Sequence, residues 1–510
     1  MTTLFRARAI SFLALVAASI ATPAAAQSRP APISEAEVRA HIAVLASDDF
    51  EGRAPGTAGE TKTLDYLAKT WASYGLTSGT NDAATPWFQP VPLVERKPFA
   101  QTVQAFAGSR RIAIDTDAIL LSGRNATDSV NADLVYVGYG VNADGKVNAD
   151  VAGKIAVMLF ADPKFDGLET PPGRREREKL LAEAGARAVL IVAPKAAPWG
   201  QIRTQATSGA MRLVKDDVGA PIAGLLREDA LAALLKPARL SLEAAAKLAE
   251  NPGFAGRALS VRMDLVTSTI VRSFASHNVI AKLAGSKPDA GAIVLLGHWD
   301  HFGICRGEEA EDRICNGAVD NASGMAVLLT VAQRLARAKA AGVQLDRDVY
   351  FMGTTAEERG LLGAYHYADK PNVPLDQILV ALNVDTVAIA KKGAPVAIIG
   401  RGETDLDPQI EAVATSIGRS IEPSKDANAF IRRQDGWALA AKGVKSLMVG
   451  GSFADLALLQ AFLSTAYHQP DDELTDATEL GGATEDANLH VALVQHFADT
   501  AKYTPAPTGD

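Results

Sequence analysis

The spacing of apolar and polar residues predicts a chain in which helices and strands alternate. Apolar residues at every third or fourth position predict a helix that starts after Ser34 and another over residues 60–74. Ser34 with Glu37 three residues later is typical of a helix start, because each side chain can bond backbone N–H groups of the first turn. From residue 258 onward, helical segments alternate with short apolar runs, at residues 292–296, 349–352, 378–384 and 446–449. This alternation favours the α/β class, with a mixed, mostly parallel sheet flanked by helices.

The segment between residues 109 and 257 has a different pattern. It predicts one Ala-rich helix over residues 229–248, and it contains β-like apolar runs at residues 132–137, 154–160 and 188–192. We therefore expect a smaller, β-rich α/β domain at 109–257. It would be inserted into a larger domain formed by residues 27–108 and 258–510.

Composition excludes several classes of protein. The 510 residues are 48% hydrophobic and 22% charged, which is typical of globular domains rather than disordered or fibrous chains. The net charge is -8, and no stretch is rich in Lys or Arg. Nucleic acid is therefore not an expected partner. The sequence leaves the oligomeric state open.

The first 26 residues are interpreted as a signal peptide. Arg6 and Arg8 precede an apolar run over residues 9–21, and three alanines ending at Ala26 form a small-residue cleavage site. The run is short for a membrane span, although an uncleaved anchor is the alternative. No Cys follows the cleavage site, so no stable membrane anchor is expected. We expect a periplasmic or secreted protein after cleavage near Ala26.

The chain has only two cysteines, Cys305 and Cys315, which bracket a polar segment. In an oxidising compartment they can close a short loop as a disulfide, and two unpaired thiols are the alternative.

Ionisable side chains follow the ends of the predicted strands. His298, Glu358 and Asp385 each follow one of three apolar runs within a few residues. Open α/β sheets bind ligands at the carboxyl ends of their strands, so these groups are expected at one edge. Asp320 precedes a predicted helix, and His468 lies in a late polar loop. Two imidazoles and three carboxylates suit Zn²⁺, and with Asp320 shared they can hold two ions.

Glu357 is the carboxylate beside this set that is not needed as a ligand. A carboxylate next to metal-bound water is placed for general-base work. Each residue alone has an ordinary structural explanation: Asp320 could be a helix N-cap, and Glu357 with Glu358 could be a solvated pair. Five such residues in this order, three of them after strands, favour the metal site. The sequence lacks His-Glu-x-x-His, Gly-x-Ser-x-Gly and Walker-type motifs.

Several segments resemble the M28 metallopeptidases, the zinc aminopeptidases and their relatives. They are residues 297–303 (GHWDHFG), 316–324 (NGAVDNASG), 357–363 (EERGLLG), 383–385 (NVD) and 467–472 (YHQPDD). The resemblance covers nearly the whole mature chain. It also implies that the insert at 109–257 is a protease-associated (PA) domain.

The resemblance implies a role for each site residue. One metal ion would be held by His298 and Asp385, the other by Glu358 and His468, and Asp320 would bridge them.

Further roles follow from the same motifs. Glu357 matches the general base, and Asp300 matches the residue that orients His298. Asp472 would orient His468 in the same way, and the Tyr467 hydroxyl would bond the developing oxyanion, with a packed loop aromatic as the alternative. Many relatives carry Ser-Asp-His where this chain has Gln434, Asp435 and Gly436, so substrate specificity is not inferred.

The expected function is that of an exported metallo-aminopeptidase with two Zn²⁺ per chain, acting on a peptide or small amino-acyl substrate. A carboxypeptidase or a cyclase-type relative on the same scaffold is the first alternative. A non-catalytic binding protein is the second. The preferred N-terminal residue and the role of the insert stay open.

Overall fold

The computed structural model describes residues 1–2, 31–165, 171–343 and 345–505. Almost all of the predicted signal peptide, including the cleavage site near Ala26, lies outside these residues, so export stays a prediction. Among the described residues, none of the helices combines the length and the hydropathy that a membrane crossing requires.

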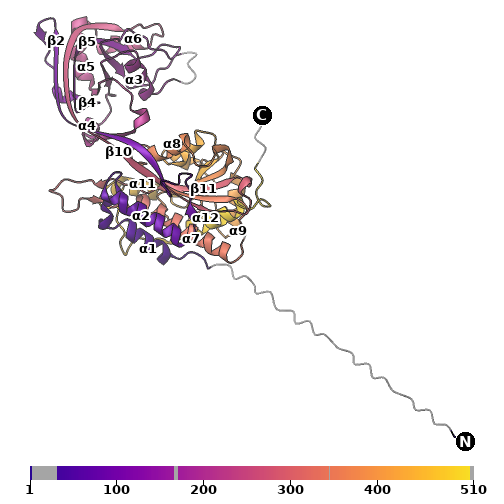
Figure 1. The fold of residues 1–510 in the computed structure, drawn as a ribbon. Coiled ribbons are helices and arrows are strands. Elements are labelled where there is room, and N and C mark those ends of the chain that lie inside the picture. Colours follow the sequence, from indigo (N-terminus) through magenta and orange to yellow (C-terminus); the bar gives the residue numbers. More distant parts are fainter. Residues whose placement is uncertain (3–30, 166–170, 344, 506–510) are drawn as a thin grey trace.

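Two bodies of unequal size are joined by a long ribbon of two antiparallel strands (Figure 1). The ribbon strands are β2 (Phe88–Ala107) and β10 (Arg257–Leu283). Through β10 the sheets of the two bodies form one continuous sheet. The predicted fold class, a mixed and mostly parallel sheet flanked by helices with a smaller inserted domain, is confirmed.

The larger body is built on a sheet with four parallel strands at its centre. In spatial order these are β17 (Ser446–Gly450), β15 (Ile378–Asn383), β11 (Ala292–His298) and β14 (Asp348–Thr354). Antiparallel neighbours flank them, β16 (Ala397–Ile399) next to β17 and β10 next to β14. All four predicted strands are present. Because they run parallel to one another, their carboxyl ends lie at one edge of the sheet.

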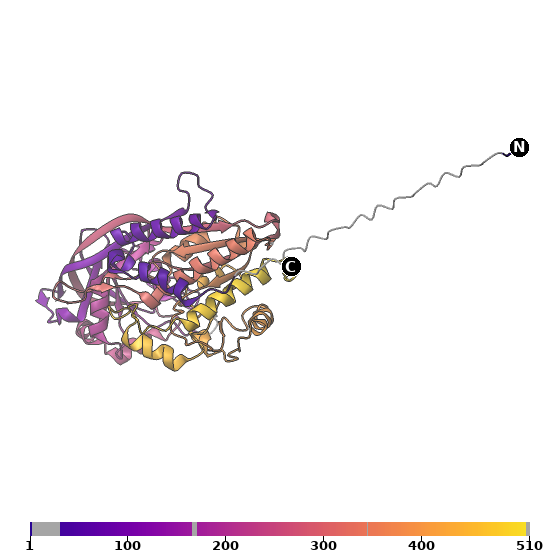
Figure 2. The ribbon, with the colours of Figure 1, turned by 90° about the horizontal axis from the view of Figure 1, so that it is seen from below.

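Helices cover both faces of this sheet. One face packs against α1 (Glu35–Leu45), α2 (Ala58–Ser73), α7 (Ser323–Ala340), α9 (Asp407–Ser416) and α12 (Gly481–Phe497). Several of them lie side by side in Figure 2. The other face packs against α8 (Leu362–Asp369) and α10 (Gly436–Ala440). In β11, Ile293 and Leu295 belong to the first core, and Val294 and Leu296 to the second. Because successive side chains point to opposite faces, an apolar run is needed when both faces are covered.

The helix start at Ser34 is confirmed. The Ser34 backbone N–H donates to the Glu37 carboxylate at 2.8 Å, and the Glu37 N–H donates to the Ser34 hydroxyl at 3.4 Å. The single helix predicted over residues 229–248 is wrong, because the chain forms α5 (Glu228–Leu235) and α6 (Leu242–Ala249) instead. Pro237 lacks the N–H that a continuing helix needs, and Arg239 is left-handed with φ 54°.

The smaller body contains the other part of this continuous sheet, with cores on both faces. Its parallel strands are β5 (Thr127–Gly138), β6 (Ile155–Leu159), β7 (Ala188–Val192) and β9 (Ile222–Leu226), with β4 (Ile119–Gly123) antiparallel at the edge. Besides α5 and α6 it contains α3 (Arg174–Glu183) and α4 (Trp199–Ser208). Its core includes Val103 of β2 and Leu265 of β10. The ribbon strands therefore serve both bodies.

The smaller body contacts the larger one close to a predicted site residue. Strand β8 (Ala210–Leu213) pairs with β2, and Leu213 packs in one apolar cluster with Ala356 and Leu362 of the larger body. Lys215 forms an ion pair with Asp369 across the same junction. The junction between the two bodies thus lies next to the turn that follows β14.

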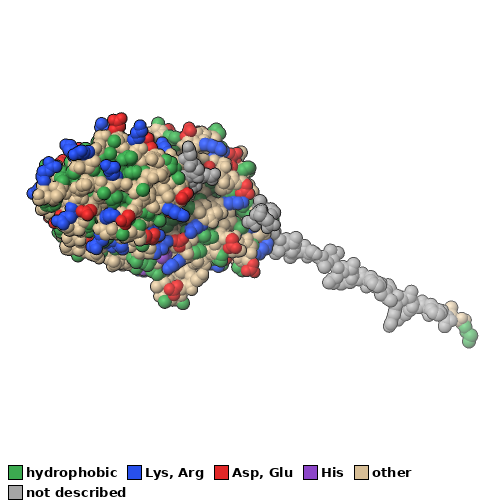
Figure 3. Space-filling model, turned by 90° about the horizontal axis from the view of Figure 1, so that it is seen from above, with side chains coloured by type: hydrophobic (Ala, Val, Ile, Leu, Met, Phe, Trp, Pro, Cys, Tyr) green, Lys and Arg blue, Asp and Glu red, His purple; other side chains and the backbone are tan. Residues whose placement is uncertain are grey.

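On the face shown in Figure 3, basic and acidic side chains are interspersed.

We predict that Gly324→Ala lowers the thermal unfolding temperature, with a cost of about 1–3 kcal/mol. A Cβ at Gly324 would collide with the Asn321 side chain and the Val384 carbonyl, because α7 starts directly against the end of β15. Differential scanning fluorimetry would measure the change. Gly200→Ala is the matched control, since a Cβ at this helical position meets open space and should cost nothing. Equal unfolding temperatures for the two variants would contradict the prediction.

Candidate metal centre

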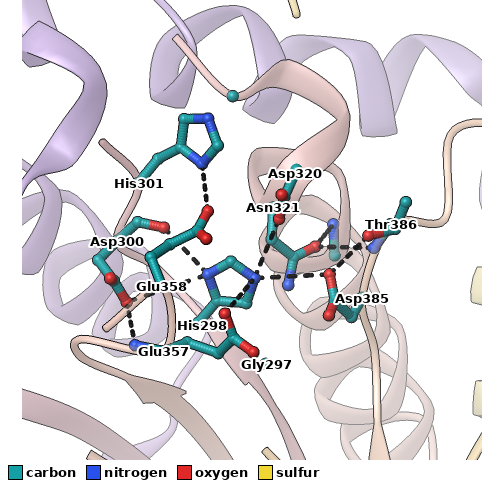
Figure 4. Close-up of polar contacts among 12 residues, drawn as sticks. Gly297, His298, Asp300, His301, Asp320, Asn321, Glu357, Glu358, Asp385 and Thr386 are labelled. Carbon is teal, nitrogen blue, oxygen red and sulfur yellow. Dashed lines mark hydrogen bonds and ion pairs between the residues drawn. The ribbon is translucent and has the colours of Figure 1, made fainter. Parts of the chain in front are cut away.

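Three neighbouring parallel strands bring their terminal residues to one place (Figure 4). His298 is the last residue of β11, Glu358 follows β14, and Asp385 follows β15. These are the three predicted ligands that the strand pattern had placed at one edge. They meet because β11 lies between β14 and β15.

The other two predicted ligands come from loops. Asp320 lies in a short irregular turn (Ala318–Ala322) that precedes α7. Its φ of -111° and ψ of 95° are not helical, and Ala322 is the residue that precedes the helix. The alternative role of Asp320 as the N-cap of α7 is therefore wrong. His468 follows α11 (Leu456–Thr465).

The two carboxylate oxygens of Asp320 face different imidazoles. The distance from His298 Nε2 to Asp320 Oδ1 is 3.2 Å, and from His468 Nε2 to Asp320 Oδ2 it is 3.4 Å. Asp385 Oδ1 lies 3.5 Å from His298 Nε2, and Glu358 Oε2 lies 2.9 Å from His468 Nε2. The five side chains thus form two groups of three that share Asp320.

These distances fit metal ligands. Zinc bonds of about 2.0–2.1 Å at a tetrahedral angle hold two donor atoms about 3.3 Å apart. The set of donors, imidazole nitrogens with carboxylate oxygens, also suits Zn²⁺. The residues present therefore fit a zinc centre.

The electrostatics of the cluster also call for cations. Burial raises the pKa of Glu357 well above its ordinary value, and burial raises the pKa of Asp300 to about 7. Burial alone would lower the pKa of His298, but the carboxylates of Glu357 and Asp385 raise it well above its ordinary value. Carboxylates that are crowded away from water resist ionisation unless a positive charge lies among them.

Comparison with known proteins agrees with this geometry. Residues 278–491 match the profile of peptidase family M28, and residues 130–233 match that of the PA domain. The chain therefore contains an M28 peptidase region at residues 278–491, which is preceded by a PA domain at residues 130–233. A peptidase is an enzyme that hydrolyses peptide bonds, and this match supports that activity for the chain.

Individual relatives are distant. The Arabidopsis thaliana protein named probable glutamate carboxypeptidase LAMP1 is 27% identical over 179 residues, which are 33% of this chain but only 24% of the relative. An aminopeptidase from Aneurinibacillus sp. strain AM-1 has a similar fold, with a TM-score of 0.56 and 20% identity over 92% of this chain and 95% of that one. BSAP, a zinc aminopeptidase from Bacillus subtilis, is 18% identical over 93% and 98%, with a TM-score of 0.47.

Asp300 supports the M28 site in two ways. Its backbone carbonyl lies 3.0 Å from His298 Nδ1, whereas its carboxylate is 3.9 Å away. That carboxylate instead accepts the backbone N–H of Glu357 at 3.1 Å. The predicted orientation of His298 by Asp300 therefore operates through the carbonyl, and the side chain positions the turn that carries Glu357.

Asp472 does not contact His468, contrary to its predicted role. Its carboxylate accepts the backbone N–H groups of Val319 and Asp320 at 2.8 and 3.0 Å. Burial raises its pKa to about 6. The residue thus holds the irregular turn that presents Asp320, because two backbone donors of that turn have no helical partner.

His301 is a functional candidate that the sequence analysis did not single out. It is fully buried, and its Nδ1 lies 2.6 Å from Glu358 Oε1. Its other ring nitrogen has no partner among the described residues. His301, Asp320 and Glu358 are also close enough to hold an ion, so two imidazoles compete for one position. The sequence did contain an indication of this role, because His301 is the last residue of the segment GHWDH, which also contains His298.

Arg53 is a second residue that the sequence did not reveal. It is 1% exposed, and its guanidinium donates to four backbone carbonyls, those of Leu45, Trp299, Asn316 and Gly317, at 2.6 to 2.9 Å. Burial lowers its pKa to about 10, and nearby carboxylates, including those of Asp472 and Asp320, oppose the shift. Arg53 therefore ties the end of β11 to the loop that leads to Asp320.

Tyr467 lies directly beside the candidate ligand His468. The two rings are stacked, with centroids 3.6 Å apart. Tyr467 also lines a small pocket with Asp385, and the apolar part of this pocket consists of Phe430, Met448, Phe453, Leu459 and Leu463. No hydrogen bond of the Tyr467 hydroxyl occurs among the described residues, so its catalytic role stays a prediction.

A disulfide braces the loop of His468. Cys305 and Cys315 are bonded in a hairpin formed by β12 (Gly303–Ile304) and β13 (Ile314–Cys315). The Cys315 sulfur lies 3.6 Å from the His468 carbonyl. Of the two possibilities for the cysteines, the structure has the disulfide.

Asp435 adds a further buried carboxyl group. It is 1% exposed and accepts a hydrogen bond from the Thr354 hydroxyl at the end of β14. Burial raises its pKa to about 6. Asp435 was noted in the sequence only as a residue that relatives share, and it packs behind the candidate ligands rather than among them.

We predict that Arg53→Met destabilises the protein by about 3–5 kcal/mol and lowers its zinc content, because four buried carbonyls lose their donor and the carboxylates lose a countercharge. Thermal unfolding and metal analysis would measure both effects. Arg110→Met, on an exposed two-residue strand, is the control and should change neither. Wild-type stability of Arg53→Met would show that the guanidinium does not organise the site.

Proposed function

We propose that the protein is a co-catalytic zinc aminopeptidase that hydrolyses the N-terminal bond of a peptide or small amino-acyl substrate. The observation that supports this most is the position of Asp320, whose two oxygens each face one imidazole. His298 and Asp385 would hold one Zn²⁺, Glu358 and His468 the other, and Asp320 would bridge them. His301 then fits as the residue that fixes Glu358, since it already bonds the second oxygen of that carboxylate.

Bound zinc would supply an acidic water and polarise the scissile carbonyl. Glu357 takes the proton from the attacking water and returns it to the leaving nitrogen. Its carboxylate lies 3.9 Å from His298 Nε2, so it stands beside the candidate ligands. Asp300 fixes the Glu357 backbone during both transfers. The Tyr467 hydroxyl, on a ring stacked against His468, would donate to the developing oxyanion.

A carboxypeptidase is the second candidate. The curated plant relative is named a glutamate carboxypeptidase, although it matches over only a quarter of its own length. Hydrolysis of N-blocked peptides would favour this candidate, and hydrolysis of only those substrates with a free amine would favour the aminopeptidase. We also propose export to the periplasm or medium, which the Cys305–Cys315 disulfide supports because such bonds persist in oxidising compartments.

We predict that Glu357→Gln lowers kcat by about 10²–10⁴-fold and leaves the zinc content unchanged, because the amide cannot accept the proton and the ligands remain. Hydrolysis of a panel of amino-acyl amides, together with metal analysis, would measure this. Glu243→Gln, an exposed position on α6 of the smaller body, is the control. Turnover of Glu357→Gln at the wild-type rate would refute the assignment of the base.

We predict that His468→Ala reduces bound zinc to about one ion per chain or fewer, because the imidazole is one of the donors to the second ion. Metal analysis after dialysis would measure the stoichiometry. Removal of the metal by a chelator should abolish hydrolysis, and added Zn²⁺ should restore it. Unchanged stoichiometry in His468→Ala would exclude that residue as a ligand.

A further inference from the structure

Arg359 places a cation beside the candidate metal centre. It directly follows Glu357 and Glu358 in a tight turn, in which the Gly360 N–H donates to the Glu357 carbonyl at 2.8 Å. The Arg359 N–H donates to the Ala356 carbonyl at 3.3 Å. The turn that presents the proposed base therefore also fixes the position of the Arg359 backbone.

The side chain of Arg359 is held by an aromatic ring that also contacts a candidate ligand. Its guanidinium carbon lies 5.0 Å from the centre of the Phe302 ring, and that ring is 4.4 Å from the His468 ring. A guanidinium over an aromatic face is held by cation–π attraction. The Phe302 ring thus contacts both the Arg359 guanidinium and the His468 ring.

The Arg359 guanidinium has no charged partner among the described residues. Arg53, by contrast, is saturated by four carbonyls, and Arg306 donates to the side chain of Gln469. Arg359 is only partly exposed, so its orientation is restricted before any ligand arrives. A planar guanidinium that is free and pre-oriented is suited to bind a carboxylate through two parallel hydrogen bonds.

We propose that Arg359 binds the free α-carboxylate of the residue that leaves after hydrolysis, so that the preferred substrates are dipeptides with a free C terminus. This inference rests on the proposed function, because it takes the scissile bond to lie at the metal centre. The carboxylate of a dipeptide is one residue away from that bond, and Arg359 is the cation that adjoins the proposed base and the ligand Glu358 in the chain. An amide or a long peptide lacks the charge at this point.

Arg433 is the competing cation. It lies over the Phe430 ring at 5.5 Å and lines the pocket that includes Asp385 and Tyr467. The pocket that Arg433 lines is largely apolar and includes the candidate ligand Asp385. Arg359 instead contacts Phe302, which packs against the candidate ligand His468. The two arginines can therefore be separated by mutation.

The test compares a dipeptide with its C-terminal amide as substrates of the zinc-loaded protein. We expect wild-type kcat/KM to be about tenfold higher for the acid, which is the effect of one charge-assisted pair. In Arg359→Ala the ratio should fall towards one through an increase in KM for the acid, and Arg359→Lys should retain part of it. Arg432→Ala, which removes a guanidinium stacked on Trp437 outside the site, should leave the ratio unchanged.

Three results would overturn the inference: equal rates for acid and amide in the wild type, an unchanged ratio in Arg359→Ala, or loss of the ratio in Arg433→Ala alone. Calorimetric titration of both compounds into Glu357→Gln keeps the test independent of turnover. Tighter binding of the acid that depends on Arg359 supports the inference even without hydrolysis, and equal binding refutes it. Absence of hydrolysis in the wild type would count against the proposed function instead.

Discussion

The repulsion among buried carboxylates at the end of one sheet is the constraint on which the structure depends. Asp300, Asp320 and Asp435 are each at most 3% exposed, and the side chains of Glu357 and Glu358 are 11% and 3% exposed. Charges of one sign cannot be gathered away from water unless opposite charge accompanies them. Three imidazoles and the guanidinium of Arg53 provide only part of it, so the cluster is arranged to receive cations.

The protein holds this cluster in place mainly through its backbone. Parallel strands set the spacing of His298, Glu358 and Asp385 without any contribution from their side chains. The loops need other means, and there the buried ions Arg53 and Asp472 bond backbone groups. Arg53 also offsets part of the negative charge, and Asp472 fixes the turn that presents Asp320.

The strand-end ligands could be predicted because strand position alone determines where they meet. Arg53 and Asp472 could not be assigned correctly, since a side chain that bonds backbone carbonyls or N–H groups leaves no complementary residue in the sequence. The prediction of a single helix over residues 229–248 was wrong for a different reason. The apolar spacing of the sequence continues across Pro237, although the helix does not. Strand β10 was also not foreseen. Its pattern reflects two different cores at its two ends, so no single period runs through it.

Strand β10 has a consequence for how the two bodies can be treated. It pairs with β5 through its first half and with β14 through its last residues, so both sheets use it as an inner strand. Cutting it out with either body would leave the other with a long unpaired edge, and such edges invite association with further chains. The PA domain consequently shares its strands with the larger body, and any division between the two bodies has to pass through the middle of β10.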